Sequence, residues 1–398
     1  MTFLELEPTG VAAGGDALAR DAGGRVAFVE GALPGERVGA EVVQERKDFV
    51  RARVIEVLDP SPSRVEPPCP FVAAGCGGCQ WQHIDPAAQS RLKVDIVIDA
   101  LRRIAHRPDP PMAGEVRAVP ATAYRTTLRL AVGRDGRAAY HRRHGHDLVA
   151  VDSCLIAHPA LEDLVVNGRF PRAREVTLRV SASTGERVAV VHPAGAGLHV
   201  PADVAAGGRI HEELAGRRWR ISATSFFQAG PAGAELLVDA VGDAAGDALA
   251  GGGLLVAADA GGGLLGGALA GGRGNVAVVA IESHPAAARD AKANLADLDA
   301  RVLQIDVGEW RAPDEPPALV VADPARTGLG KPGVQALVAA GAPVLVLVSC
   351  DPASLARDTA LLAGAGYRLA SVQVLDLFPH TFHVETVSRF ERAAPSRS

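Results

Sequence analysis

The sequence predicts an α/β protein in three parts, with an open α/β sheet in its second half. Three observations lead to this prediction. From about residue 216 apolar strands alternate with helix-like segments, a central part of mixed α+β character carries a cysteine cluster, and the start shows short strands broken by glycine. We therefore expect a small β-barrel at residues 1–60, a central domain at 61–215 and an open α/β domain at 216–398.

The first 60 residues alternate apolar and polar side chains in short pieces, as in GGRVAFVEGALPGERV. An alternation with a period of two, interrupted by glycine, is typical of the strands of a small β-barrel. Two proline-rich segments, PSPS at 60–63 and PPCP at 67–70, follow the last of these pieces. Proline interrupts regular structure, so we place the end of the first domain there.

The central part combines one long helical pattern with several strand-like pieces. The segment AAQSRLKVDIVIDALRRIAH (87–106) has helical periodicity. The pieces YRTTLRLAVG (124–133), REVTLRVSA (174–182) and RVAVVHPAG (187–195) are rich in β-branched residues.

Four of the five cysteines form a candidate metal site. Cys69, Cys76 and Cys79 are close in sequence, and Cys154 is the natural fourth ligand. In a reducing cytosol such a cluster indicates a metal more than disulfides. A four-thiolate iron–sulfur cluster suits this spacing, with zinc and unligated buried thiols as alternatives. Cys350 is left alone and is free to react.

In the second half, strand-like segments end in polar or reactive side chains, namely Asp259, Glu282, Asp323 and Cys350. An open α/β sheet binds its ligands at the carboxyl ends of its strands. A glycine-rich loop follows Asp259, and Glu282 lies at the end of the next strand, where an acid binds ribose hydroxyls. Glycines that serve only packing are the alternative for this loop.

Cys350 and Glu385 together suggest a chemistry. Cys350 precedes a predicted helix, whose N-terminus favours the thiolate. Glu385, in FPHTFHVETV, is available as a base. A thiolate that adds to carbon 6 of a pyrimidine activates carbon 5 for methylation, and a base then removes the proton at carbon 5. The alternatives are a buried apolar cysteine and a solvated edge glutamate.

Charge and hydropathy narrow the class of protein. The net charge of −5 argues against binding of polyanions by the whole surface, but local basic runs occur at 45–53, 140–148 and 217–220. The uncharged stretch 336–350 is shorter than the roughly 20 residues that cross a bilayer. The acidic start does not resemble a secretory signal. We expect a cytoplasmic protein without membrane contact.

Several segments together resemble the RNA 5-methyluridine methyltransferases. SFFQAG, DPARTGLG, VSCDPASLARD and FPHTFHVETV are similar to four signature segments, in family order. The first 60 residues resemble the family's TRAM barrel, and the four cysteines its iron–sulfur site. The resemblance covers almost the entire chain. It implies a Rossmann-like class I methyltransferase domain, preceded by a TRAM β-barrel and a central α+β domain with a 4Fe–4S cluster.

The resemblance also implies roles for individual residues. Cys350 would be the nucleophile and Glu385 the base. The positions implied for binding S-adenosylmethionine are Gln228, Asp259, Gly261, Gly263, Glu282, Asp306 and Asp323. The cluster ligands would be Cys69, Cys76, Cys79 and Cys154. The cofactor loop departs from the family pattern, because it lacks the usual aromatic residue.

The function implied is methylation of carbon 5 of a uridine in structured RNA. The barrel and the cluster favour 23S ribosomal RNA as the substrate, with transfer RNA as an alternative. A further alternative is a catalytically silent RNA-binding protein whose cofactor loop has degenerated. The cofactors expected are S-adenosylmethionine and a 4Fe–4S cluster, and we expect a monomer.

Overall fold

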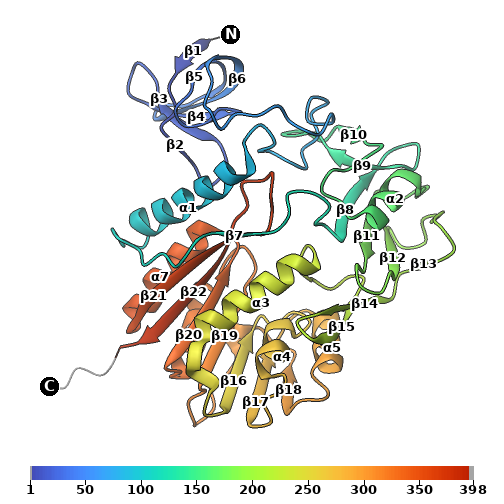
Figure 1. Ribbon diagram of the computed structural model, residues 1–398, viewed down its shortest axis with the longest axis vertical. Helices are drawn as coiled ribbons and strands as arrows, with labels where there is room; N and C mark the ends of the chain where they lie inside the picture. Colours follow the sequence, from blue (N-terminus) through green and yellow to red (C-terminus); the bar gives the residue numbers. More distant parts are fainter. Residues whose placement is uncertain (1, 394–398) are drawn as a thin grey trace.

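A computed structural model describes residues 2–393, and its N-terminal strands form one six-stranded sheet (Figure 1). These strands are β1 (Phe3–Leu6), β2 (Gly10–Val11), β3 (Ala17–Arg20), β4 (Val26–Glu30), β5 (Arg37–Glu45) and β6 (Phe49–Asp59). The order is β1-β5-β6-β4-β3-β2. Within residues 2–393 no ladder joins the edge strands β1 and β2, so the small β part is present without the closure that the word barrel implies. The two-residue β2 offers little backbone for such a ladder.

The central part contains a second six-stranded sheet, in the order β10-β9-β8-β11-β12-β13. Its strands are β8 (Thr127–Val132), β9 (Ala138–His141), β10 (Leu148–Ala150), β11 (Glu175–Val180), β12 (Arg187–His192) and β13 (Val204–Ala206). The helix α2 (Pro159–Asn167) contacts β11, and a hairpin of β14 (Arg209–Leu214) and β15 (Arg217–Ser222) follows.

The predicted helix of the central part is α1 (Pro86–Arg103). Asp85 caps it, since its carboxylate accepts hydrogen bonds from the backbone amides of Ala87 and Ala88. In Figure 1 α1 lies between the N-terminal sheet and the C-terminal sheet. The helix also contacts α7 (Pro352–Gly364) of the C-terminal part, a contact that the sequence pattern did not predict.

The C-terminal sheet has eight strands in the order β18-β17-β16-β19-β20-β22-β21-β7. They are β7 (Arg117–Ala118), β16 (Gly253–Ala258), β17 (Val276–Ile281), β18 (Ala300–Leu303), β19 (Leu319–Ala322), β20 (Val344–Ser349), β21 (Tyr367–Asp376) and β22 (Glu385–Arg392). Strand β22 is antiparallel to β20 and β21, whereas the ladders from β18 to β20 are parallel. The short β7 comes from the part of the chain predicted as the central domain; the domain boundaries themselves stay a prediction.

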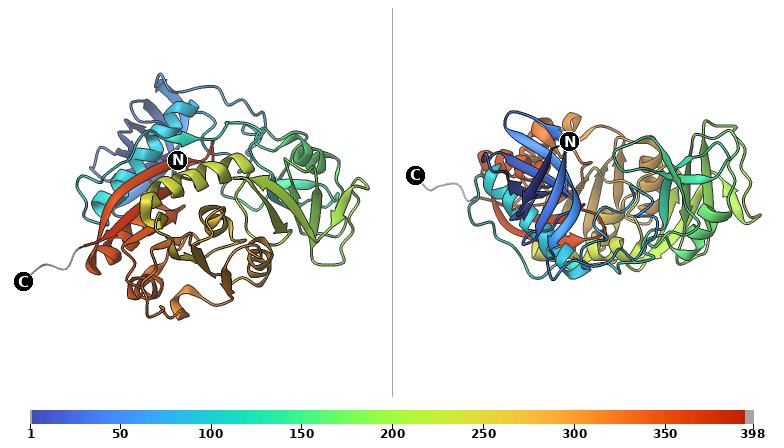
Figure 2. Two further views of the ribbon diagram at one scale, coloured as in Figure 1. Left: turned by 60° about the horizontal axis from the view of Figure 1, so that its bottom comes forward. Right: turned by 90° about the horizontal axis from the view of Figure 1, so that it is seen from above.

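Helices cover both faces of this sheet (Figures 1 and 2). They are α3 (Pro231–Ala245), α4 (Leu264–Ala270), α5 (Pro285–Asn294), α6 (Gly330–Ala339) and α7 (Pro352–Gly364), with short 3-10 turns at Gly246–Leu249 and Val307–Glu309. Alternate residues of β20 pack in different cores: Val346 with residues of α3 and α4, and Leu347 with residues of α1, α6 and α7. All six residues of β20 are buried, as expected of a central strand covered on both faces.

A small apolar cluster joins the N-terminal sheet to the rest of the protein. It consists of Val11, Leu33, Trp81, Ile84, Ala88 and Ile96, with Leu92 and Phe382 packed against it. The indole of Trp81 donates a hydrogen bond of 3.0 Å to the carbonyl of Gly15. Gly15 has a φ of +89°, and a Cβ there would lie 2.7 Å from the Phe382 ring. Only glycine therefore allows this close approach.

Among the helices that the structure describes, none is long and apolar enough to cross a membrane.

Candidate active site

Five predicted residues follow the carboxyl ends of neighbouring strands in the C-terminal sheet. Asp259 follows β16, Glu282 follows β17, Asp306 lies beyond β18, Asp323 follows β19 and Cys350 follows β20. These strands are adjacent and parallel, so their carboxyl ends lie along one edge of the sheet. The open α/β arrangement thus brings the acids and the thiol to the edge where such folds bind ligands.

Cys350 lies between β20 and α7. Ser349 of β20 pairs with Thr386 of β22, and the next residues along this antiparallel ladder are Cys350 and Glu385. Burial, and next the charges of Glu385 and Asp323, raise the pKa of the Cys350 thiol to about 11. The expectation that the helix N-terminus favours the thiolate is therefore wrong for this state of the protein, because burial and two neighbouring acids outweigh it.

Glu385 is a buried acid at the start of β22. The residue is only 4% exposed to solvent. Its Oε1 atom has no hydrogen-bond partner within residues 2–393. Burial, and next the charge of Asp323, hold its pKa well above the usual value, while Arg326 acts in the opposite direction. A buried carboxyl oxygen without a partner, with a strongly raised pKa, is of the kind found at functional sites.

The glycine loop is tied to the next strand by Glu282. One carboxylate oxygen of Glu282 accepts a 2.7 Å hydrogen bond from the Gly261 amide, and the other accepts one of 2.6 Å from His284. A Cβ on Gly261 would meet no atom within 4 Å, so the space above the loop is open. Gly263, with a φ of +87°, directly precedes α4 and approaches Leu295 closely.

The other predicted cofactor residues surround this loop. Burial, and next the charges of Glu282 and Asp306, raise the pKa of Asp259 to about 6. The pKa of Asp323 is raised to about 7 by burial and by Asp259. Asp306 is exposed and accepts a hydrogen bond from the Gly308 amide. The acids therefore share one electrostatic environment at the edge of the sheet.

Gln228 is buried in the loop between β15 and α3, after the exposed Phe226. The carboxylate of Asp290 on α5 fixes this loop, since it accepts hydrogen bonds from the amide and hydroxyl of Ser222 and from the hydroxyl of Ser225. No sequence motif pointed to Asp290. An acid inside a helical pattern gives no signal of its own for a partner 68 residues away.

Asn294, one turn further along α5, connects two loops. Its amide donates hydrogen bonds to the carbonyl of Gly262, at 2.8 Å, and to that of Arg220, at 2.9 Å. Its side-chain oxygen accepts one from the Arg220 amide. The glycine loop and the end of β15 are thus held to the same helix. No motif in the sequence pointed to this residue.

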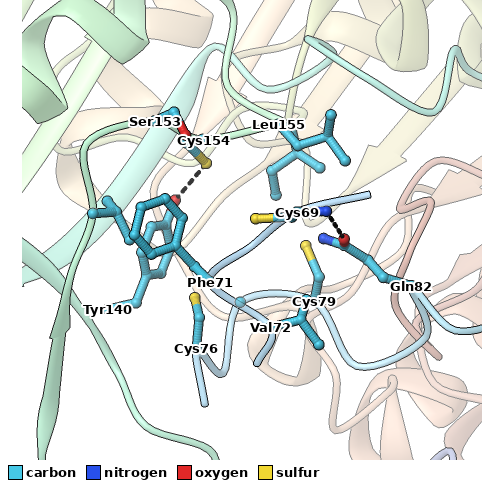
Figure 3. Close-up of a pocket in the computed structure, with 13 residues that line it drawn as sticks. Cys69, Phe71, Val72, Cys76, Cys79, Gln82, Tyr140, Ser153, Cys154 and Leu155 are labelled. Carbon is cyan, nitrogen blue, oxygen red and sulfur yellow. Dashed lines mark hydrogen bonds between the residues drawn. The ribbon is translucent and has the colours of Figure 1, made fainter. Parts of the chain in front are cut away.

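The four clustered cysteines line one pocket in the central part (Figure 3). The hydroxyl of Tyr140 lies 3.1 Å from the sulfur of Cys154. Burial, and to a lesser degree the neighbouring cysteines, raise the pKa of Cys79 to about 12. The fold therefore brings Cys154 together with the 69–79 segment, which is distant from it in sequence.

Within residues 2–393, no group of three or more histidine, cysteine, aspartate or glutamate side chains is arranged to hold a metal ion. The pocket thus assembles the cysteines that the sequence singled out, and the metal itself stays a prediction.

Comparison with known proteins gives the family. Residues 5–55 match the model of the TRAM domain. An uncharacterised RNA methyltransferase of Streptomyces coelicolor is 36% identical, over 98% of this chain and 93% of its own length. One of Gloeobacter violaceus is 33% identical, over 97% of this chain and 95% of its own.

The fold has a solved counterpart. The crystal structure of the tRNA (uracil-54, C5)-methyltransferase of Pyrococcus abyssi, in complex with S-adenosyl-L-homocysteine, superposes with a TM-score of 0.74. The match covers 97% of this chain and 100% of that chain at 23% identity, and so concerns the fold. The predicted α/β fold class is thereby confirmed. Because the relatives from Streptomyces coelicolor and Gloeobacter violaceus are 36% and 33% identical along nearly the whole chain, the chain belongs to the family of RNA methyltransferases that they represent.

Proposed function

We propose that this protein methylates carbon 5 of a uridine in structured RNA, with S-adenosylmethionine as the methyl donor. The observation that carries the proposal is the register of β20 against β22, from which Cys350 and Glu385 follow as neighbours at the ligand-binding edge of the sheet. A thiol and a carboxyl are the two groups that this reaction needs, because carbon 5 of uracil is too weak a nucleophile unaided.

The reaction proceeds through a temporary bond to the protein. The Cys350 thiol gives up its proton to solvent, and the thiolate attacks carbon 6 of the ring, so that the electron pair of the ring double bond moves to carbon 5 and its conjugated carbonyl. S-adenosylmethionine, when bound, would supply the methyl group that carbon 5 takes up and would leave as S-adenosylhomocysteine. Glu385 then removes the proton from carbon 5, the double bond to carbon 6 re-forms, and the thiolate leaves.

The raised pKa values match this sequence of events. In the free protein the Cys350 thiol is protonated and the pKa of Glu385 is high, so neither group carries an uncompensated charge in a buried site. Glu385 must lose its proton before it acts as the base, and its raised pKa opposes that loss in the free protein.

The cofactor would lie over the glycine loop. Open space above Gly261 leaves room for a ligand close to the backbone, and Glu282 lies at the strand end where ribose hydroxyls bind. We assign Gln228, Asp259, Gly261, Gly263, Glu282, Asp306 and Asp323 to this site. The missing aromatic residue reduces the area available for stacking on adenine, so we expect modest affinity for the cofactor.

We further propose that Cys69, Cys76, Cys79 and Cys154 hold a 4Fe–4S cluster. The number and the type of the ligands fit a 4Fe–4S cluster, because each of its four irons takes one thiolate. The four cysteine side chains also line a single pocket. A bound cluster would fix the 69–79 segment against Cys154. Anaerobically purified protein should then be brown and lose its colour in Cys76→Ser, whereas zinc would give colourless protein with bound metal.

As the RNA substrate we propose 23S ribosomal RNA, because the TRAM domain at 5–55 adds an RNA-binding module to the catalytic part. The target base must leave its stack to reach Cys350, so a loop or a flipped nucleotide is required. We expect the protein to be a monomer and to be located in the cytoplasm.

One experiment tests the reaction and its residues. The protein is incubated with methyl-labelled S-adenosylmethionine and unmodified 23S ribosomal RNA or transfer RNA, and labelled 5-methyluridine is mapped. We expect transfer that is lost in Cys350→Ala. Glu385→Gln should accumulate a covalent protein–RNA adduct on denaturing gels, because elimination is blocked. Binding of RNA without transfer by the wild type would instead support a catalytically silent protein.

A further inference from the structure

The segment 377–384 joins Asp376 at the end of β21 to Glu385 at the start of β22. This segment leads directly into Glu385, the proposed base, and it contains no helix or strand of its own. Backbone of this kind takes its position from side chains that reach it from elsewhere. Two residues of α1, Gln89 and Lys93, do so here, and both are completely buried.

Lys93 holds the beginning of this segment. Its ammonium group donates hydrogen bonds to the carboxylate of Asp376 and to the carbonyl of Phe378, the latter at 3.0 Å. Ser90, one turn earlier on the helix, donates to the other oxygen of Asp376 at 3.1 Å. A buried lysine is unfavourable unless it is paired, so this contact constrains the segment strongly.

Gln89 holds the middle of the segment. Its side-chain oxygen accepts a 2.6 Å hydrogen bond from the His380 amide. Its side-chain nitrogen donates to the carbonyls of Trp81, at 3.1 Å, and Ile84, at 2.8 Å, and lies 3.3 Å from a ring nitrogen of His380. One buried amide thus ties this segment to the segment that follows the clustered cysteines.

The spacing of these two residues suits the task. Residues four apart lie on the same face of a helix, so Gln89 and Lys93 reach the segment side by side. The chain that precedes Glu385 is held by α1, through the His380 amide and the Asp376 carboxylate. The chain from Glu385 onward is held in β22 by its ladders with β20 and β21. Cys350 is on a different connection, between β20 and α7.

From this arrangement we infer that Gln89 and Lys93 of α1 are positioning residues for Glu385, which set the proton-removal step and leave the addition of Cys350 largely unaffected. The inference rests on the proposed function. Neither residue touches the reacting atoms; they act by fixing the backbone that leads into the base. A displacement of about 1 Å is enough to slow a proton transfer about a hundredfold.

The test separates proton removal from addition. The double variant Lys93→Met with Asp376→Leu removes the buried pair without leaving an unpaired charge, so the fold is retained. Gln89→Met is a second, independent variant. Arg103→Ala, which breaks an exposed ion pair with Asp99 on the same helix, is the matched control. The methyl-transfer rate, the RNA concentration for half-maximal rate and the fraction of enzyme trapped as covalent RNA adduct are measured.

We expect the rate to fall by about tenfold or more in both variants, with the half-maximal RNA concentration changed by less than about threefold. The trapped adduct should increase, as in Glu385→Gln, while Arg103→Ala behaves as the wild type. A merely structural role would lower the melting temperature and the active fraction without adduct accumulation.

Two results would overturn the inference: a folded double variant with the wild-type rate, or a reduced rate with no increase in adduct. Failure of the proposed function is a separate outcome, because then the wild type itself transfers no methyl group. Hydrogen–deuterium exchange provides a readout that does not depend on catalysis. Amides 377–384 should lose protection in both variants, and unchanged protection there would also refute the inference.

Discussion

Glu385 opens β22, and Cys350 directly follows the neighbouring antiparallel strand β20, in a ladder whose last pair is Ser349 with Thr386. After burial, the charge of Glu385 is the next cause that raises the pKa of Cys350. Burial, and next the charge of Asp323, raise the pKa of Glu385 itself, so that both groups favour their uncharged forms in the free protein.

Alkylation of Cys350 should therefore depend on pH far into the alkaline range. Only the thiolate reacts, and a pKa of about 11 leaves little thiolate at neutral pH. We expect the rate constant with iodoacetamide to rise about tenfold per pH unit between pH 7 and 10. Mass spectrometry of the peptide that contains Cys350 distinguishes this thiol from the other four.

Glu385→Gln is the control for that experiment. It removes the negative charge that raises the thiol pKa, so its profile should shift to lower pH. A wild-type profile that levels off near pH 8 would contradict the assigned environment of Cys350.

Stability should fall as pH rises, because of Asp323. Its folded-state pKa of about 7 lies above its ordinary value of 3.8, so the folded protein binds the proton more tightly than the unfolded chain. The stability that this provides is present at low pH and is lost as pH rises through the folded pKa. Asp323→Asn should thus be more stable than the wild type at pH 8 by about 1 kcal/mol, a value reduced for partial exposure to water.

Differential scanning fluorimetry between pH 4 and 8 measures this effect. Asp297→Asn is the matched control, because the ion pair with Arg217 lowers the pKa of Asp297 and its stabilising effect has the opposite sign. An advantage of Asp323→Asn that does not grow with pH would argue against the raised pKa.

Substitution of Gly263 should weaken the glycine loop. Its φ of +87° disfavours other residues, and a Cβ would lie 3.1 Å from the Leu295 side chain. Gly263→Ala should therefore lower the free energy of unfolding by about 1–2 kcal/mol and weaken cofactor binding. Urea denaturation and calorimetry with S-adenosylhomocysteine measure the two effects.

The neighbouring Gly262 provides the control for this substitution. A Cβ there would make only ordinary contacts, with Asn294 at 3.7 Å and Asp290 at 3.9 Å. Gly262→Ala should be close to neutral, and equal losses in the two variants would refute the conformational argument.

Loss of Asp290 should be costly although it lies outside every motif. Asp290→Ala leaves the buried hydroxyl of Ser225 and the amide of Ser222 without their acceptor. We expect a loss of about 3 kcal/mol of stability and weaker cofactor binding through the loop that carries Gln228. Asp203→Ala, which removes an exposed partner of Arg187, should cost less than about 1 kcal/mol.

Urea denaturation of both variants decides this prediction. A small effect of Asp290→Ala, similar to that of Asp203→Ala, would show that the loop holds its position by other contacts.

Local patterns predicted the parts of the protein whose physics is local. The strand–helix alternation after residue 216 and the helical periodicity of 87–106 gave the right elements, because burial on one or two faces imposes a period on the sequence. The acids and the thiol at strand ends could be placed on one edge because parallel strands all present the same end there.

Long-range pairing explains what could not be predicted. Lys93 and Asp376 are 283 residues apart, and nothing in either local sequence indicates the other. The same is true of β7, which joins the C-terminal sheet beside β21. The raised pKa of Cys350 could not be predicted for a related reason: the helix N-terminus is visible in the sequence, whereas the burial and the facing acids are not.

The apolar cluster around Trp81 has a consequence for protein engineering. The turn at Gly15 packs against Phe382 and accepts the Trp81 indole hydrogen bond, so the N-terminal part contacts the segment 377–384 directly. Exchanging the N-terminal sheet for that of a distant relative would supply the strands but not the close contact of Gly15 with Phe382 and Trp81. A functional chimaera would have to carry over the matching tryptophan and phenylalanine surfaces as a unit.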